Sequence, residues 1–175
     1  MEVLQVKSEL VKMVELYREK RPARVLEIGC WDGGTLREWL TKHTPEVVVA
    51  VDLDHRNRDA YQEWRHPDTS LHLYVGHSQD DAQIAGMRSH APYDWVFIDA
   101  DHDEEPVRSD AEVCYSCVRP GGLMLFHDIV PGPGLPVPGP GIVLEELRQA
   151  GHKVREIVED PGGWEWAHGI GIVQL

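Results

Sequence analysis

Short apolar segments that alternate with helical stretches constrain the fold of this chain more than any other feature. The expected strands are 25–28, 47–51, 71–75, 95–98 and 123–126, and the expected helices between them are 35–42, 58–64, 80–88 and 104–118. Strands that are almost uninterruptedly apolar are typical of a parallel sheet covered by helices on both faces. An amphipathic helix within residues 1–20, a helix at 142–150 and strands near 153–158 and 169–174 complete the expected pattern. We therefore expect an α/β fold.

Composition excludes several classes of protein. The 175 residues are expected to form a single domain, 1–175, without a visible boundary. With 17 basic and 30 acidic residues the net charge is −13, which repels nucleic-acid phosphates. No apolar run reaches the roughly 18 residues of a membrane span, and residues 1–20 do not resemble a signal peptide. Cys30, Cys114 and Cys117 are expected to be reduced thiols that fill helix–sheet contacts. These observations favour a cytoplasmic protein without nucleic-acid or membrane partners.

Two segments towards the C-terminus have two interpretations each. Residues 130–141, VPGPGLPVPGPG, are too rich in Pro and Gly for a helix or strand, so they are expected to form either a lid or substrate wall at a site or a stiff connector. Trp164, Trp166 and His168 either line an aromatic substrate or oligomer surface or belong to the core.

Polar residues follow nearly every expected strand. In an open parallel sheet, ligands bind beyond the carboxyl ends of the strands, where the strand order reverses. The residues expected at that edge are Glu27, Gly29, Asp52, His77, Ser78, Asp99, Asp101, His102, His127 and Asp128. A single Asp at such a position is commonly a helix cap, but five strand ends on one rim indicate a binding site.

The glycine-rich turn within LEIGCWDGG (residues 26–34) and the VAVDLD segment (49–54) together predict a nucleoside-containing cofactor. Glycines let the backbone approach a ligand closely, and Asp52 can accept hydrogen bonds from both ribose hydroxyls. A dinucleotide motif would read GxGxxG, whereas here the turn contains Trp31 and Glu27 precedes it.

The pattern E-x-G-x-x-x-G-G instead resembles motif I of the class I, Rossmann-like S-adenosylmethionine (SAM)-dependent methyltransferases. The segment WVFIDADHDEEPVRSDAEVCYSCVRPGGLMLFHDI (95–129) is similar to the hallmark of the cephalosporin-hydroxylase-like or macrocin-O-methyltransferase-like group. The resemblance implies a three-layer sandwich whose seven-stranded, mostly parallel sheet has an antiparallel last strand. The cofactor-binding residues that it implies are Glu27, Gly29, Cys30, Trp31, Gly33, Asp52, Leu53, His77, Ser78 and Asp99. Two departures are Ala100, where the family usually has Gly, and His77, where an acid near the adenine is common, which leaves Ser78 and Gln79 to face the base.

A metal site is expected opposite the cofactor. If the fourth and fifth strands are neighbours, Asp99 and Asp128 can share a hard cation such as Mg²⁺, Mn²⁺ or Ca²⁺. The resemblance maps Asp99 and Asp128 onto metal positions, His127 onto a third position that is often acidic, and His102 onto a general base that acts together with Asp99. Alternatively, Asp99 and Asp101 cap the helix that begins near Glu104, and His127 hydrogen-bonds the backbone.

The resulting hypothesis is metal-assisted O-methylation of a small-molecule hydroxyl, on a sugar or another natural product, with SAM as methyl donor. One alternative is a non-catalytic SAM-binding or assembly subunit. The chain has little beyond the core to recognise a large substrate, so either homo-oligomer partners complete the pocket or catalysis has been lost. A nicotinamide-dependent oxidoreductase is the other alternative.

Overall fold

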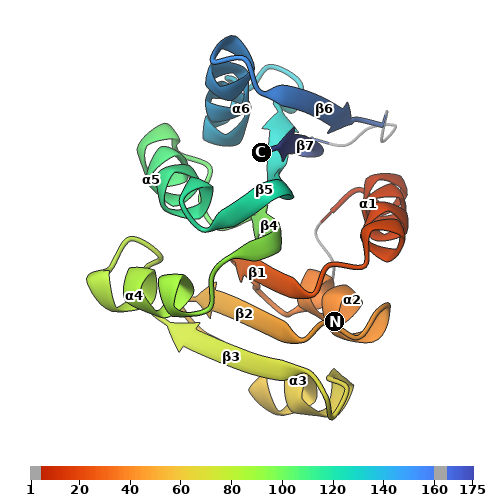
Figure 1. Ribbon diagram of the computed structural model, residues 1–175. Coiled ribbons are helices and arrows are strands. Elements are labelled where there is room, and N and C mark those ends of the chain that lie inside the picture. The colour runs from red at the N-terminus through yellow and green to blue at the C-terminus, as the bar shows by residue number, and fades with distance from the viewer. Residues whose placement is uncertain (1–4, 160–164) are drawn as a thin grey trace.

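The computed structural model describes residues 5–159 and 165–175, which form six helices and seven strands (Figure 1). In chain order the elements are α1 (Lys7–Lys20), β1 (Arg24–Ile28), α2 (Gly34–Thr41), β2 (Val47–Asp52), α3 (Arg58–Trp64), β3 (Ser70–Val75), α4 (Asp81–Ser89), β4 (Tyr93–Ile98), α5 (Glu104–Tyr115), β5 (Val118–Val130), α6 (Gly139–Gln149), β6 (Lys153–Ile157) and β7 (His168–Gln174).

The strands form one sheet in the order β3-β2-β1-β4-β5-β7-β6. Neighbouring strands from β3 to β5 are parallel, whereas β7 runs antiparallel to both β5 and β6. The expected seven-stranded sheet with an antiparallel last strand is therefore confirmed. Because β1 lies between β2 and β4, the strand order reverses at the β1–β4 boundary, and a ligand crevice is expected at the carboxyl ends of these strands.

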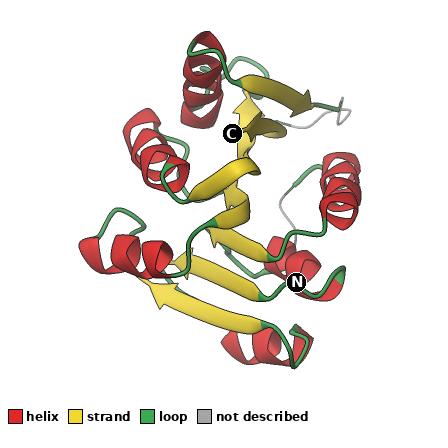
Figure 2. Cartoon of the chain, viewed as in Figure 1, coloured by secondary structure: helices red, strands yellow, loops and turns green. Residues whose placement is uncertain are grey.

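Helices cover both faces of the sheet, α1, α2 and α3 on one side and α4, α5 and α6 on the other (Figures 1 and 2). Each layer has its own apolar core. On the α1 side, the fully buried rings of Tyr17, Trp39 and Trp95 lie 4.7–5.4 Å from one another, and the hydroxyl of Tyr17 donates a 2.8 Å hydrogen bond to the carbonyl of Trp39. Burial of such rings contributes roughly 2–3 kcal/mol each, which anchors the first two helices to the sheet.

Two expected boundaries were wrong. The helix expected over 104–118 ends at Tyr115, and Val118 begins β5, which continues to Val130. The first half of this strand consists largely of polar, Gly and Pro residues, so its sequence does not indicate a strand. The antiparallel pairing of β5 with β7 begins only at Leu123. The 130–141 loop is shorter than expected, because α6 already begins at Gly139. Pro140 is compatible with this start, since the first turn of a helix requires no backbone N–H from it.

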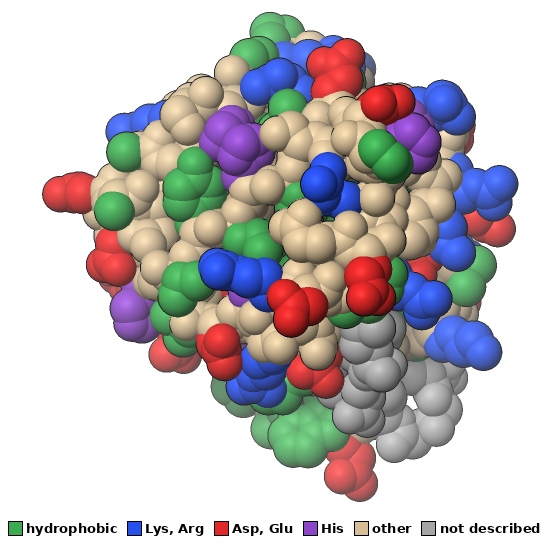
Figure 3. All heavy atoms as spheres, turned by 90° about the horizontal axis from the view of Figure 1, so that it is seen from below, with side chains coloured by type: hydrophobic (Ala, Val, Ile, Leu, Met, Phe, Trp, Pro, Cys, Tyr) green, Lys and Arg blue, Asp and Glu red, His purple; other side chains and the backbone are tan. Residues whose placement is uncertain are grey.

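The structure also bears on what the sequence indicated for the three cysteines, for membrane spans and for surface charge. Cys30, Cys114 and Cys117 are buried and unpaired, as expected for thiols that fill the core. Among the described residues, no helix is long and apolar enough to cross a membrane. On the face drawn in Figure 3, basic and acidic side chains are interspersed and form no basic stripe. Pro161, Gly162 and Gly163 in the sequence also predict a turn between the last two strands. These residues and Trp164 lie outside the described residues.

Candidate active site

A pocket of about 840 Å³ opens at the carboxyl ends of β1, β4 and β5. Its volume is in the range typical of small-molecule sites. The pocket brings together seven of the residues expected from the sequence, namely Gly29, Cys30, Trp31, Asp99, His102, His127 and Asp128. The strand-end argument therefore located the crevice correctly.

Gly29 and Gly33 shape the turn that forms one wall of this pocket. Both have positive φ, of 84° and 80°. A Cβ on Gly29 would lie 2.2 Å from the backbone oxygen of Asp99, and one on Gly33 would lie 2.3 Å from the ring of Tyr61. Glycine is thus required here by the close packing of β1 on β4 and of the turn on α3, in addition to any approach of a ligand.

Asp52, at the end of β2, holds this turn in place. Its Oδ2 accepts hydrogen bonds from the backbone N–H groups of Cys30 (2.5 Å) and Trp31 (3.0 Å), and its Oδ1 accepts one from the N–H of Asp54 (2.9 Å). The bonds fix Trp31 in a left-handed conformation, with φ of 48°. The carboxylate expected to hold a ribose is therefore already oriented against the glycine turn.

Glu27 lies beneath the turn. Its side chain is fully buried, and one carboxyl oxygen accepts a hydrogen bond from the hydroxyl of Thr35, a residue that lines the pocket. Burial raises the pKa of Glu27 well above its usual value. A neutral carboxyl group at this position can anchor the start of α2 without an unpaired buried charge.

The residues expected near the adenine lie outside the pocket lining. Leu53 and His77 are exposed, whereas Ser78 is buried. The amide of Gln79 donates hydrogen bonds to Oγ of Ser78 (2.9 Å) and to Oδ1 of Asp110 (2.8 Å). Burial raises the pKa of Asp110 to about 6, so the segment after β3 is fastened to α5 through a titratable carboxyl.

A bulge at the end of β5 turns two consecutive side chains toward the pocket. Adjacent residues of a regular strand point to opposite faces, but the pairing of β5 with β7 shifts between His127 and Val130, and Asp128 has φ of 58°. A left-handed backbone is costly for an aspartate and is common at functional sites. Here it allows His127 and Asp128 to line one pocket.

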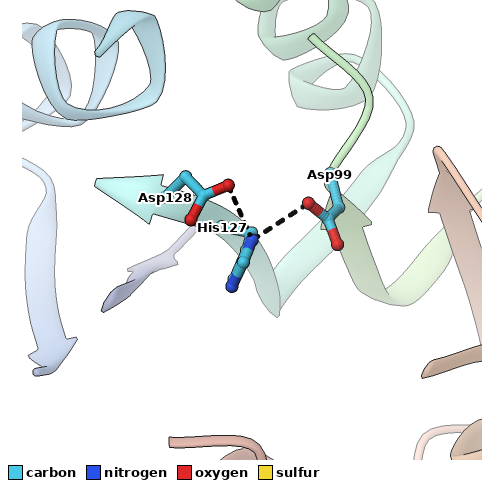
Figure 4. Close-up of side chains that lie close together, drawn as sticks. All are labelled: Asp99, His127 and Asp128. Carbon is cyan, nitrogen blue, oxygen red and sulfur yellow. Dashed lines mark ion pairs between the residues drawn. The ribbon is translucent and has the colours of Figure 1, made fainter. Parts of the chain in front are cut away.

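His127 lies between two carboxylates (Figure 4). Its Nδ1 is 3.0 Å from Oδ1 of Asp99 and 3.1 Å from Oδ2 of Asp128, and its side chain is only 4% exposed. Burial lowers the pKa of His127, but the charge of Asp99 and the contact with Asp128 outweigh it and raise the pKa to about 10. The alternative in which His127 bonds the backbone is not the arrangement seen.

These three side chains fit a divalent cation. One ligand atom from each residue lies within 4.8 Å of the others, and two of the three are carboxylate oxygens. Both ring nitrogens of His127 are buried without a hydrogen-bond partner among the described residues, and Nδ1 could serve as a ligand when it loses its proton.

His102 is joined to the same cluster. Its Nε2 lies 2.6 Å from Oδ2 of Asp128, and its side chain is 56% exposed. The hydrogen bond to Asp128 raises the pKa of His102. Burial raises the pKa of Asp128, but the hydrogen bond with His102 and the contact with His127 outweigh it and lower that pKa. A carboxylate that orients a histidine in this way is a common arrangement around a catalytic base.

The helix-capping alternative applies in part to Asp101. Its Oδ1 accepts a hydrogen bond from the N–H of Asp103, and Asp103 is the N-cap of α5. Asp99 does not cap the helix, because its carboxylate faces Gln5 on one side and His127 on the other.

Sequence reasoning missed several residues of the pocket. Gln5 lines it without having been expected there. Leu135 also lines it and belongs to the Pro/Gly loop, which therefore contributes to the pocket wall, one of the interpretations that the sequence left open. Trp166, for which the sequence left core and substrate surface open, is 70% exposed and lines the pocket. His168 begins β7 and is half-buried. For Gln5, nothing in the sequence around it indicates that this residue lines a pocket.

Comparison with solved structures shows the same fold in methyltransferases. An O-methyltransferase from Bacillus cereus in complex with SAH superposes with a TM-score of 0.75 at 18% identity, over 97% of this chain and 81% of that one. TomG from Streptomyces achromogenes, an O-methyltransferase of tomaymycin synthesis in complex with SAM, gives 0.68 at 17% identity, over 96% and 79%. The methyltransferase MycE of the mycinamycin pathway, in complex with Mg, SAH and mycinamycin VI, gives 0.66 at 23% identity. That similarity covers 99% of this chain but only 49% of MycE.

A family comparison agrees with the fold. Residues 26–129, from the glycine turn to the end of the 95–129 motif, match a family described as a methyltransferase domain. The match spans more than half of the 175 residues. The chain therefore belongs to this methyltransferase domain family, and its fold is that of the class I, Rossmann-like methyltransferases.

Proposed function

We propose that the protein transfers the methyl group of SAM to a hydroxyl oxygen of a small molecule. The observation that carries the proposal is that one pocket joins the glycine turn, which is held by Asp52, to the His102–Asp128 pair. The turn and Asp52 would bind the cofactor. The pair across the pocket would act on the acceptor. The turn does not contain the GxGxxG motif of dinucleotide-binding proteins, which favours SAM over a nicotinamide cofactor.

When bound, SAM supplies an electrophilic methyl carbon, whose bond to sulfur breaks with the electron pair remaining on sulfur as the acceptor oxygen attacks. The protein has to orient the acceptor in line with that bond and to take up its proton. Because Asp128 engages Nε2 of His102, the Nδ1 of His102 is the nitrogen that would accept the proton. The buried Cys30 and Thr35 and the half-buried Gly29 form a wall that would exclude water from the methyl group.

We further propose that Asp99, His127 and Asp128 hold a divalent cation. Such an ion lowers the pKa of an acceptor hydroxyl and fixes its position. The buried Nδ1 of His127 and the two carboxylate oxygens beside it support this assignment. The Mg in the MycE complex is an independent reason to test it.

The rim of the pocket suggests the kind of acceptor. Trp31, Leu135 and Trp166 line the pocket and expose 52%, 49% and 70% of their surface. Exposed apolar side chains around a polar centre are typical of sites for ligands with an apolar body. An acceptor with two adjacent hydroxyls on an apolar or aromatic skeleton fits this rim better than a free sugar does. The TomG and MycE pathways concern natural products, which agrees with such an acceptor.

The cofactor assignment is tested by calorimetric titration of the purified protein with SAH. We expect binding with a micromolar Kd and at least tenfold weaker binding to Asp52→Asn, because charge-assisted hydrogen bonds contribute about 1.5–3 kcal/mol each. Asp68→Asn is the control, since its carboxylate is 85% exposed at the opposite end of the sheet from the pocket. Undetectable SAH binding to the wild-type protein would refute the proposal, and NADH binding would instead favour an oxidoreductase.

Catalysis is tested with SAM labelled in the methyl group and a panel of catechols and glycosides with adjacent hydroxyls. Methylated product detected by mass spectrometry is the expected result. SAH binding without transfer to any acceptor of the panel would favour a non-catalytic cofactor-binding subunit.

A further inference from the structure

We infer that the cluster of Asp99, His127 and Asp128 selects a divalent first-row transition ion, such as Mn²⁺, Fe²⁺, Co²⁺ or Zn²⁺, over Mg²⁺ and Ca²⁺. The inference rests on the metal site of the proposed function and goes beyond it by naming the class of ion. It depends on one residue, the buried His127 between the two carboxylates.

The spacing of the ligand atoms is that of a first coordination shell. Two ligands at right angles around an ion with bonds of about 2.1 Å lie about 3.0 Å apart. The Nδ1 of His127 lies 3.0 Å from an oxygen of Asp99 and 3.1 Å from an oxygen of Asp128. Both separations therefore match those between neighbouring ligands of an ion of this size.

The orientation of the imidazole is the second observation. Asp99 and Asp128 lie on opposite sides of His127 (Figure 4), and neither oxygen is placed for a directed hydrogen bond with Nδ1. A histidine that is 4% exposed without such a bond among the described residues has a desolvated Nδ1, which can bind a metal ion when it loses its proton. Desolvated polar atoms of this kind are rare in proteins and call for a partner.

The donor set then decides between classes of ion. Mg²⁺ and Ca²⁺ prefer oxygen ligands, whereas imidazole nitrogen suits Fe, Ni, Cu and Zn, and affinity rises along the first-row series. A site with two carboxylates and a third oxygen ligand would accept Mg²⁺ readily. Replacement of that oxygen by the nitrogen of His127 weakens the preference for Mg²⁺ and strengthens binding of the transition ions.

Gln5 supports the same assignment from outside the cluster. Its amide donates a 2.8 Å hydrogen bond to Oδ2 of Asp99, so Oδ1 is the oxygen that remains directed to His127. A hydrogen bond to the second oxygen of a carboxylate ligand is a typical support of metal sites.

The experiment measures metal affinity without turnover. The protein is stripped with EDTA, dialysed and titrated calorimetrically with Mn²⁺, Co²⁺, Zn²⁺ and Mg²⁺ in turn, and the visible absorption of bound Co²⁺ is recorded. We expect Mn²⁺ and Co²⁺ to bind at least tenfold more tightly than Mg²⁺. His127→Asp is expected to reduce this ratio at least tenfold and to change the cobalt spectrum, because a nitrogen ligand is replaced by oxygen.

His66→Asp is the matched control, since the side chain of His66 is 51% exposed and is expected to leave the ratio unchanged. If His127→Asp fails to fold by circular dichroism, His127→Asn replaces it, with loss of Co²⁺ binding as the expected result. Equal or tighter binding of Mg²⁺, absence of any metal binding, or an unchanged ratio in a folded His127 variant would overturn the inference. SAH titration of the same sample distinguishes the two proposals, because SAH binding without metal selectivity refutes only this one.

Discussion

Gln5 and Asp99 are joined by a 2.8 Å hydrogen bond although 94 positions separate them in the chain. Gln5 precedes α1, and Asp99 follows β4 at the centre of the sheet. The bond occupies one oxygen of the carboxylate and leaves the other facing His127. The segment before α1 therefore takes part in setting the geometry of the site, and α1 holds it there through the buried Met13 and Tyr17.

Removal of this bond is expected to weaken metal binding at the proposed site while the fold is retained. Gln5→Leu should lower the affinity for Mn²⁺ about tenfold, the lower end of the range for lost hydrogen bonds to metal ligands. Calorimetry provides the measurement. Gln62→Leu is the control, because Gln62 is an exposed residue of α3. An unchanged Mn²⁺ affinity in Gln5→Leu would show that Asp99 is oriented without help from Gln5.

Replacement of His102 is expected to affect the chemical step. His102→Gln should lower kcat about 100-fold or more, because a positioned base contributes roughly 10²–10⁴-fold to such reactions. Its SAH affinity should remain within about twofold of wild type, since the proposed function assigns His102, which lines the pocket, to the acceptor and not to the cofactor. His66→Gln serves as the control. A kcat within threefold of wild type would mean that the proton leaves by another route.

Truncation of Trp166 is expected to affect acceptor binding. Its ring is 70% exposed at the pocket, where a bound apolar acceptor would cover it. Trp166→Ser should raise the KM for an aromatic acceptor about tenfold, which corresponds to roughly 1.4 kcal/mol of lost apolar contact, and leave the Kd for SAH unchanged. Tyr115→Ser, which removes a ring that is 48% exposed on α5, should leave both unchanged. An unchanged KM in the Trp166 variant would exclude contact with the acceptor.

Asp110 makes the stability of the fold depend on pH. Its folded-state pKa of about 6 exceeds the value of about 3.9 in an unfolded chain, so the folded protein binds this proton more tightly. The contribution of Asp110 to the free energy of unfolding is therefore fully present below pH 4. It is lost as the pH rises through 6, and the total loss is on the order of 3 kcal/mol.

Asp110→Asn should remove this slope and should be the more stable protein at pH 7.5. Urea unfolding followed by circular dichroism at pH 4, 5, 6 and 7.5 measures the difference. In Asp68→Asn, where the carboxylate is exposed, the slope should persist. Parallel pH profiles for Asp110→Asn and wild type would contradict the prediction.

The sheet could be predicted because most of its strands are recognisable from their own short segments of sequence. The strands β1, β2 and β4 are largely apolar runs. Asp52 is the last residue of β2 and Asp99 directly follows β4, and the parallel arrangement places both on the same edge. The positions of Gly29, Asp99 and His102 in the pocket follow from this reasoning. By contrast, the adenine-side assignment of Ser78 could not anticipate its contact with Gln79, or the bond from Gln79 to Asp110 on α5.

The remaining features depend on tertiary packing. Gln5 reaches Asp99 only because α1 docks on the sheet, and nothing near Gln5 in the sequence indicates it. The N-terminal half of β5 is masked by Arg119, Pro120 and two glycines, which are poor strand formers. The bulge at Asp128 has no sequence signal either, because the residue that adopts the left-handed backbone is an aspartate and not a glycine.

The left-handed backbone at Asp128 separates what this position needs for folding from what it needs for activity. Glycine and asparagine adopt that conformation most readily, whereas valine or isoleucine would be strained in it. Saturation mutagenesis at residue 128 should therefore yield two different rankings. Gly and Asn variants would accumulate as folded protein to at least the level of wild type, and β-branched variants would be depleted. Only aspartate would retain turnover, so the position would show high tolerance in a measure of abundance and almost none in a measure of activity.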